Sequence, residues 1–210
     1  MKKLIILGAA NPNVIRTIDS INSKKNKDIF VECFVDNDKK KIGKKFMKKD
    51  VLDTQTFLKT YSKNDCYLFN SIASSTQIRK DITEFYKKKG FQFQSIIHPD
   101  IDTNYTKIGS GVFLQENSIV QANVRVSDFV IVSSNSCIAH DSSIGKFTFI
   151  GPAVYICGRV EVGESCYIGV GAKILPDVKI GKNSIIAAGS IVNKNIKANS
   201  RVIGMPARVF

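Results

Sequence analysis

Residues 108–192 read IGSGVFLQENSIVQANVRVSDFVIVSSNSCIAHDSSIGKFTFIGPAVYICGRVEVGESCYIGVGAKILPDVKIGKNSIIAAGSIV and carry Ile, Leu or Val at every sixth position. The series runs without interruption from Ile108 to Val192, fifteen aliphatic residues in all. A period of six fits neither an amphipathic helix nor a simple alternating strand. It is typical of a parallel β-helix, in which each hexad is a short strand followed by a corner. Three strands close one triangular coil, so the fifteen hexads predict five coils.

A second position repeats four residues after each aliphatic and holds Val, Ser, Thr, Cys, Ala or Ile throughout, from Val112 to Ile196. We expect both repeated positions to point into the prism, where stacked coils bury a continuous apolar column. The fourth residue of a hexad is expected at a tight corner with positive φ, which Gly and Asn tolerate. Gly or Asn fills this position at Gly111, Asn117, Asn123, Asn135, Gly171, Asn183 and Gly189.

The front of the chain has a different pattern, in which apolar, strand-like runs alternate with helix-like stretches. Strands are predicted within residues 2–10, 28–36, 66–70 and 91–97, and helices within 12–23, 54–61 and 75–89. This alternation predicts a small parallel sheet with helices packed on it, a Rossmann-like α/β domain. We therefore expect an α/β domain at residues 1–98 and a β-helix domain with a C-terminal tail at residues 99–210.

Composition narrows the setting. The chain has 210 residues and a net charge of +13, but its lysine runs have no interleaved aromatic residues and no nucleic-acid-binding module. We interpret the lysines mainly as a solvated surface, and otherwise as a field that attracts polyanionic small molecules. The sequence shows no membrane span and no signal peptide, and its five cysteines form no CxxC pair. A cytoplasmic protein is expected.

The hexads contain one histidine, His140, within NSCIAHDSSIG at residues 135–145. As the third residue of its hexad it should project outward, with Asp141 at the corner. The residues one coil above and below are Gly158 and Ala122, which leave space around the imidazole. A neutral imidazole can accept a proton from a nucleophile, and an adjacent carboxylate can increase its basicity. The alternative interpretation is a surface histidine without a role.

Several motifs together resemble one family. They are IHPD at 97–100, NSCIAHDSSIG at 135–145, GPAVYICGRVEVG at 151–163 and GMPAR at 204–208, behind a small α/β domain. The chain is similar over essentially its whole length to hexapeptide-repeat sugar acetyltransferases of the sialic acid, bacillosamine and perosamine type. The resemblance implies a left-handed β-helix, a homotrimer with sites between adjacent β-helices, and acetyl-CoA as acetyl donor. His140 would be the base, and Asp141 would increase its basicity.

The resemblance also suggests ligand contacts. Positions that match the family's coenzyme contacts are Phe149, Val170 and Ala188. The stacked column of Gly151, Gly169 and Ala187 adds small residues that would let a pantetheine arm approach the backbone. Arg208 or Lys194 could meet coenzyme phosphates. For the nucleotide-linked sugar, the matching positions are Ala10, Asn11, Asp36, Asn37 and Ser74.

The sequence departs from the family pattern at two places. Many members have a second histidine where this chain has Phe149, so the thioester carbonyl would need backbone N–H groups or another side chain. The glycine-rich loop of the α/β domain is replaced by GAANPN at residues 8–13, in which Pro12 lacks a backbone donor. The acyl-transfer reaction is therefore better supported than the identity of the sugar.

The function expected from these features is acetyl-CoA-dependent acetylation of the amino group of a nucleotide-linked amino sugar, for surface glycan biosynthesis. The alternatives are O-acetylation of a sugar such as sialic acid, a formyltransferase, and a non-catalytic β-helix scaffold. A carbonic anhydrase with this prism would need three zinc-binding histidines, and the hexads have one. No metal is expected.

Overall fold

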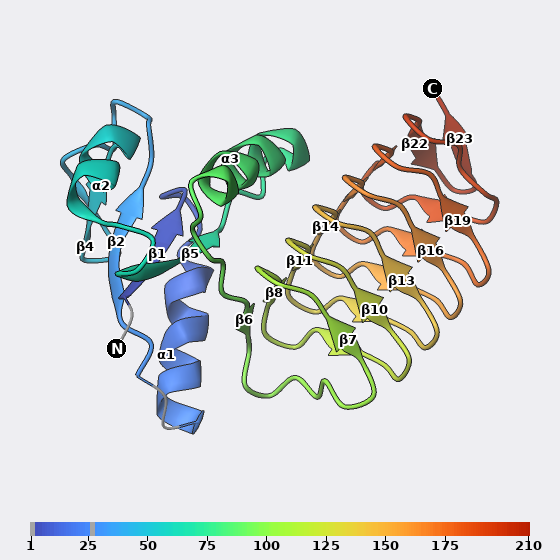
Figure 1. Cartoon of the computed structure of the whole chain (residues 1–210). Coiled ribbons are helices and arrows are strands. Elements are labelled where there is room, and N and C mark those ends of the chain that lie inside the picture. Colours follow the sequence, from blue (N-terminus) through green and yellow to red (C-terminus); the bar gives the residue numbers. More distant parts are fainter. Residues whose placement is uncertain (1–2, 26–27) are drawn as a thin grey trace. The chain divides into compact units, whose positions relative to one another are not determined.

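The structure is a computed structural model that describes residues 3–25 and 28–210. The chain forms two compact units, Met1–Pro99 and Asp100–Phe210. Figure 1 shows a sheet with helices in the first unit and a stack of triangular coils in the second. The α/β fold and the left-handed β-helix expected from the sequence are both confirmed.

The first unit contains a five-stranded sheet in the order β3-β4-β2-β1-β5. Strands β4, β2, β1 and β5 run parallel, and β3 pairs antiparallel with β4 at one edge. The strands are β1 (Lys3–Leu7), β2 (Val31–Val35), β3 (Lys45–Phe46), β4 (Lys49–Leu52) and β5 (Cys66–Asn70). The helices are α1 (Asn13–Lys25), α2 (Thr54–Thr60) and α3 (Thr76–Lys88).

Helices cover both faces of this sheet, with α1 on one face and α2 and α3 on the other (Figure 1). Strand β1 is buried on both faces, as a central parallel strand must be, and this explains its continuous apolar run. On the face of α2 and α3, Ile5 and Leu7 pack with Phe57 and Tyr86 in one core. Asp53 caps α2 by accepting a hydrogen bond from the amide of Thr56 at 2.9 Å.

Two local predictions were wrong. The sequence analysis missed the short hairpin of β3 and β4. It also predicted a strand across residues 91–97, where only Ile96–Ile97 (β6) is a strand. Phe93 makes one isolated parallel bridge with Leu68 of β5, so the chain touches the sheet edge and then leaves it. Lys2, at the start of the first predicted strand, lies outside the described residues.

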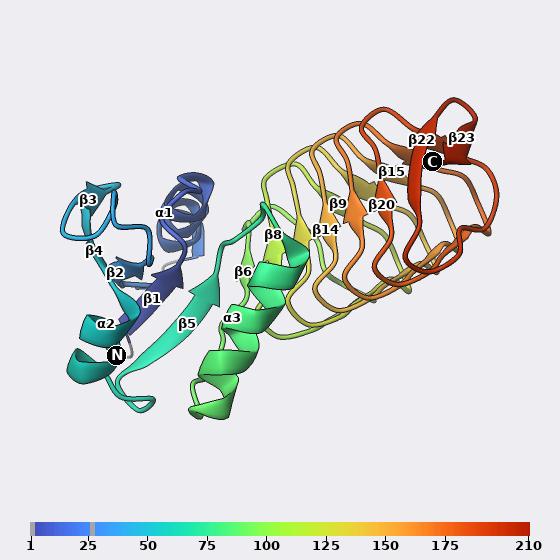
Figure 2. The same ribbon diagram turned by 90° about the horizontal axis from the view of Figure 1, so that it is seen from above.

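The second unit winds through five coils of three strands each. The first face contains β7 (Lys107–Ile108), β10 (Arg125–Val126), β13 (Ser143–Ile144), β16 (Glu161–Val162) and β19 (Lys179–Ile180). The second contains β8 (Phe113–Leu114), β11 (Ile131–Val132), β14 (Phe149–Ile150), β17 (Tyr167–Ile168) and β20 (Ile185–Ile186). The third contains β9 (Ile119–Val120), β12 (Cys137–Ile138), β15 (Tyr155–Ile156), β18 (Lys173–Ile174) and β21 (Ile191–Val192). Strands of one face pair in parallel, eighteen residues apart, and the faces are seen from two directions in Figures 1 and 2.

The inward positions are those that the hexads predicted. Every repeat aliphatic from Leu114 to Val192 is buried, as are the small residues four places on, from Val112 to Ser190. The buried hydroxyls of this second series are satisfied by the next turn of chain. Ser136 Oγ, for example, donates to the carbonyl of Gly151 at 2.8 Å. A small polar residue therefore fits the corner without leaving an unsatisfied polar atom.

Every corner residue from Gly111 to Gly189 has a positive φ, including many that are neither Gly nor Asn. A left-handed residue other than Gly costs about 1–2 kcal/mol, and hydrogen bonds between coils offset this cost. The amide of Asp141, for example, donates to the carbonyl of Ala122 in the coil below. At two corners Phe129 and Phe147 stack with ring centroids 5.0 Å apart and are buried.

The last coil is followed by a hairpin of β22 (Arg201–Gly204) and β23 (Ala207–Val209), in which β22 pairs with β20. This hairpin covers the open edge of the second face, and GMPAR forms its turn (Figure 2). Within the described residues, no helix is both long and apolar enough to cross a membrane.

The interior packing can be tested at Ile168, which is fully buried in the fourth coil. We expect Ile168→Ala to lower the free energy of unfolding by about 2–5 kcal/mol, because it removes apolar contacts and leaves a cavity. Lys173→Ala, at an exposed strand position nearby, is the control and should change it by less than about 0.5 kcal/mol. Chemical denaturation measures both, and equal small effects would show that the inward register is wrong.

Candidate active site

The central pair of the site is His140 and Asp141, at the corner that follows β12. Nδ1 of His140 lies 2.7 Å from Oδ2 of Asp141. Both side chains are about half exposed. The hydrogen bond with His140, and then one from Asn123, lowers the pKa of the Asp141 carboxyl below its ordinary value. Asp141 is therefore ionised near neutral pH and can stabilise a positive charge on the imidazole.

Neighbouring coils hold this imidazole. A methyl group on Gly158, one coil above, would lie 2.8 Å from Cε1 and Nε2 of His140, so the ring packs directly over the glycine. From the coil below, Gln121 accepts a hydrogen bond from the His140 amide at 3.0 Å through Oε1. The sequence identified the small residue above His140. It carried no signal for Gln121, whose contact depends on the side-chain conformation.

The geometry suits proton transfer. Because Nδ1 faces the carboxylate, Nε2 is the nitrogen available to accept a proton from a nucleophile. The same use of the two ring nitrogens is seen wherever a carboxylate orients a histidine base. His140 and Asp141 can therefore act as a general base with its orienting group.

A depression of about 340 Å³ adjoins this pair, within the β-helix itself. It is lined by Tyr105, Lys107, Asn123, Val124, Arg125 and Asp141. Lys107 and Arg125 are exposed and lie side by side on paired strands of the first face. The depression thus carries two positive charges on the first face beside the carboxylate of Asp141, and the two cations favour an anionic or phosphate-bearing ligand.

The expected coenzyme positions lie along a different corner, the one that follows the second face. Val170 and Ala188 are exposed, Ala187 is partly exposed, and Gly151 and Gly169 are buried. A methyl group on Gly169 would lie 2.6 Å from the amide nitrogen of Ala188. A methyl group on either glycine would therefore force the neighbouring coil to shift. The sequence analysis explained the glycines by the approach of a ligand, and close packing of the coils is a second reason for them.

Phe149 stands on the second face, and the resemblance had suggested a histidine at this position. Its ring stacks on Tyr167 with centroids 4.8 Å apart, and only 8% of Phe149 is exposed. An aromatic pair at this place offers apolar surface and no imidazole proton. Phe149 and Tyr167 pair on adjacent strands, each two residues before a glycine of the column, Gly151 and Gly169.

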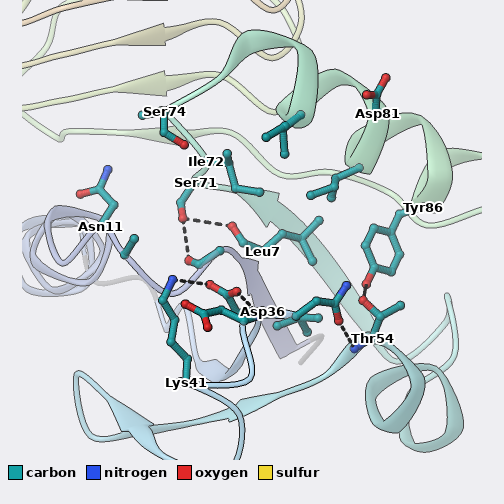
Figure 3. A pocket seen from close by; sticks show the side chains of 18 of the residues that line it. Leu7, Asn11, Asp36, Lys41, Thr54, Ser71, Ile72, Ser74, Asp81 and Tyr86 are labelled. Carbon is teal, nitrogen blue, oxygen red and sulfur yellow. Dashed lines mark hydrogen bonds and ion pairs between the residues drawn. The ribbon is translucent and has the colours of Figure 1, made fainter.

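The first unit contains a cavity of about 750 Å³ at the carboxyl ends of β1, β2 and β5 (Figure 3). All five positions expected to contact the sugar nucleotide line it: Ala10, Asn11, Asp36, Asn37 and Ser74. The strand order reverses between β1 and β5, because β2 and β4 continue to one side of β1 and β5 returns on the other. Open α/β sheets bind ligands at such a crevice.

Asp36 is held firmly in this cavity. It accepts hydrogen bonds from the amides of Ala9 and Asp38, both at 2.9 Å, and from Nζ of Lys41 at 2.8 Å (Figure 3). Burial raises the pKa of Asp36, but these hydrogen bonds outweigh burial and leave the pKa below its ordinary value. The carboxylate is therefore neutralised by the protein, and it shapes the loop after β2 more than it offers charge to a ligand.

An apolar wall of the same cavity was missed by the sequence analysis. It comes from α3, where Ile78, Ile82 and Phe85 line the space together with Tyr86. Ile78 and Phe85 are 52% and 43% exposed, which is high for large apolar side chains on an amphipathic helix. Their exposure is the available signal, and it can be seen only once the helix is placed. The hydroxyl of Ser71 lies within hydrogen-bond distance of the carbonyls of both Leu7, at 3.0 Å, and Gly8, at 2.9 Å, and so joins the loops after β1 and β5.

Among residues 3–25 and 28–210, no group of three or more His, Cys, Asp and Glu side chains is arranged to hold a metal ion.

The packing of the imidazole on Gly158 leads to a test. Gly158→Ala should force the His140 ring away from its place, because the added methyl would lie within 2.8 Å of two ring atoms. The chain has only two histidines, so selective isotope labelling gives two sets of imidazole NMR signals. We expect the His140 signals to shift and those of His98 to stay, with His140→Ala providing the assignment. Unchanged His140 signals in a folded variant would contradict this packing.

Comparison with known proteins adds family and fold. Residues 161–194 match the bacterial transferase hexapeptide family (six repeats). A search of curated proteins found no match. The structure is similar to the acetyltransferase domain of PglB from Neisseria gonorrhoeae FA1090, with a TM-score of 0.90, 25% identity and 100% of each chain covered. That domain has also been solved in complex with acetyl coenzyme A.

Two further solved structures have the same fold. PerB from Caulobacter crescentus, in complex with CoA and GDP-perosamine, has a TM-score of 0.87 and 24% identity, covering 100% of this chain and 98% of PerB. WeeI from Acinetobacter baumannii AYE has a TM-score of 0.87 and 23% identity, with both chains fully covered. The chain therefore carries the bacterial transferase hexapeptide repeat and shares the complete fold of these proteins, an α/β unit followed by a left-handed β-helix.

Proposed function

We propose that the protein is an acetyl-CoA-dependent acetyltransferase that acts on the amino group of a nucleotide-linked amino sugar, in the cytoplasm, for surface glycan biosynthesis. The observation that carries the proposal is the pairing of His140 with Asp141 at 2.7 Å, with Nε2 free for a substrate. The similarity to a PglB domain solved with acetyl coenzyme A supports the choice of acetyl donor.

In the proposed reaction, Nε2 of His140 removes a proton from the amino group as its nitrogen attacks the thioester carbonyl. The new C–N bond forms, the C–S bond breaks, and the imidazolium returns the proton to the departing sulfur. The products are an N-acetyl sugar and the free thiol. Asp141 stabilises the imidazolium during the interval in which His140 carries the proton.

The acetyl donor is proposed to lie along the corner that carries Gly151, Gly169 and Ala187, in contact with Phe149, Val170 and Ala188. The exposed members of this group offer a smooth, apolar edge that suits a pantetheine chain. Since Phe149 cannot donate a hydrogen bond, the thioester carbonyl would be bound by backbone N–H groups.

We also propose a homotrimer, which the separation of the two corners supports. His140 lies at the corner after the third face, whereas the column of Gly151 and Gly169 lies at the corner after the second face. A site that uses His140 and the glycine column together is formed most simply when the His140 corner of one copy faces the glycine corner of the next copy. Ile119, Tyr155 and Val170 are each more than 45% exposed on the β-helix, as expected of surfaces that a partner covers.

The nucleotide part of the acceptor is proposed to occupy the cavity of the α/β unit. Ile78, Ile82 and Phe85 suit the flat face of a base, and Asn11, Asn37 and Ser74 offer polar contacts. Such a cavity favours a nucleotide-linked acceptor over free sialic acid, which would need no nucleotide site. O-acetylation and a non-catalytic scaffold are the alternative outcomes of the tests below.

The reaction can be tested by measuring thiol release from acetyl-CoA with UDP-, dTDP- and GDP-linked amino sugars. At least one should be acetylated on nitrogen, as product mass and NMR would show. His140→Ala should lower kcat by roughly 10²–10⁴-fold, the usual effect of losing a general base. Its melting temperature should be unchanged because the side chain is half exposed. Acetylation of a hydroxyl would replace the proposed acceptor. No thiol release with any of these sugars would favour the scaffold.

The shared site can be tested by mixing two inactive variants. His140→Ala removes the base, and Val170→Glu places a charge on the exposed edge proposed for the acetyl donor. If each site combines residues of two copies, co-expression of both variants should restore part of the activity in mixed trimers. Sedimentation of the parent protein should give a trimer. Mixed assemblies without activity would mean that each copy contains its whole site.

A further inference from the structure

One corner of the β-helix carries a column of polar side chains. Asn123, Asp141, Arg159 and Asp177 occupy the same corner of four successive coils, eighteen residues apart. Their φ values are 61°, 60°, 57° and 65°. Because the backbone repeats so closely, each side chain leaves the prism in a similar direction and lies next to those one coil above and below.

The contacts along this column divide the two carboxylates between different partners. Asp141 accepts from Nδ2 of Asn123 at 3.1 Å through Oδ1, while Oδ2 faces His140. Arg159 does not bind Asp141. It donates from Nε and Nη2 to the two oxygens of Asp177, at 2.6 and 2.9 Å.

Arg159 is the cation in this column that could compete with His140 for Asp141. It stands one coil from Asp141 and one coil from Asp177, and its charge contributes, after His140 and Asn123, to the low pKa of Asp141. A two-pronged bond between guanidinium and carboxylate is stronger than a single hydrogen bond. If Arg159 turned to Asp141, it would take the carboxylate away from the imidazole. In the structure Asp177 binds Nε and Nη2 of Arg159, so the guanidinium is turned toward Asp177 and not toward Asp141.

Asn123 acts from the other side. Its neutral amide holds Oδ1 of Asp141 and so fixes the rotation of the carboxylate with Oδ2 toward His140. A cation at this position would compete for the carboxylate, whereas an amide orients it without adding charge.

We propose that Asn123 and Asp177 are positioning residues for the base, Asn123 by orienting Asp141 and Asp177 by holding Arg159 away from it. This inference rests on the proposed function for its effect on turnover, but its structural part does not. It predicts a result that simple loss of an ion pair would not give: removing Arg159 should correct the defect caused by removing Asp177.

The first experiment reads the hydrogen bond itself, with histidine-labelled protein and NMR. In Asp177→Ala, the Nδ1 signal of His140 should lose the signature of a strong hydrogen bond, because Arg159 now binds Asp141. In the double variant Arg159→Ala/Asp177→Ala the signature should return. Asn123→Ala should weaken it, and His98 should be unaffected throughout. An unchanged His140 signal in Asp177→Ala, or a double variant as altered as the single one, would overturn the role of Asp177. An unchanged signal in Asn123→Ala would overturn that of Asn123.

The second experiment measures turnover with the sugar found active. Asp177→Ala should lower kcat roughly tenfold, the equivalent of one hydrogen bond to a charged group, with little change in KM. The double variant should recover most of the loss. The matched control is Glu161→Ala, which breaks the exposed pair of Glu161 with Lys179, 2.8 Å apart on the first face, and should leave kcat unchanged. An equal loss in the control would mean that Asp177 acts only through stability. If the parent protein has no activity, the proposed function fails while the NMR experiment still decides the inference.

Discussion

The structure depends on the hydrogen bonds that join each coil to the next at a repeat of eighteen residues. Backbone amides such as those of Asp141 and Arg159 donate to carbonyls of the neighbouring coil, and the corner residues accept a left-handed conformation to make this possible. A left-handed residue other than Gly costs about 1–2 kcal/mol at each such corner. The hydrogen bonds between coils must offset this cost at every corner. As a consequence, residues eighteen apart become neighbours, and every outward position becomes part of a column.

The columns explain choices that no single hexad explains. A methyl group on Gly169 would lie too close to the backbone of the next coil. A methyl group on Gly158 would lie too close to the imidazole of His140, which packs against this glycine from the coil below. Because residues eighteen apart stack at the same corner, the column of charged side chains beside the base forms from residues that are close in the sequence. The rigid stack thus holds the imidazole of His140 in one position, as a general base requires.

The sequence was sufficient for the β-helix because its inward residues obey a strict period, and position in the repeat then placed His140 outward beside Gly158. It was insufficient where contacts depend on side-chain conformation, as for Gln121 and Asn123. In the α/β unit it located the loops that line the cavity, since these follow apolar strands. It missed the wall of Ile78 and Phe85, because periodicity cannot tell a helix face over a cavity from one over a core. The strand predicted across residues 91–97 was wrong because, beside β5, this segment makes only one isolated bridge, between Phe93 and Leu68.

The two units therefore differ in how strongly the residues of each site depend on their neighbours. In the β-helix, His140 and Asp141 contact residues of the coils above and below, so a substitution in one coil affects side chains in its neighbours. In the α/β unit, the cavity is built from loop residues after β1, β2 and β5 and from exposed apolar side chains of α3, each of which can vary with less effect on the sheet. A protein built in this way can keep one acyl-transfer geometry while its acceptor site changes.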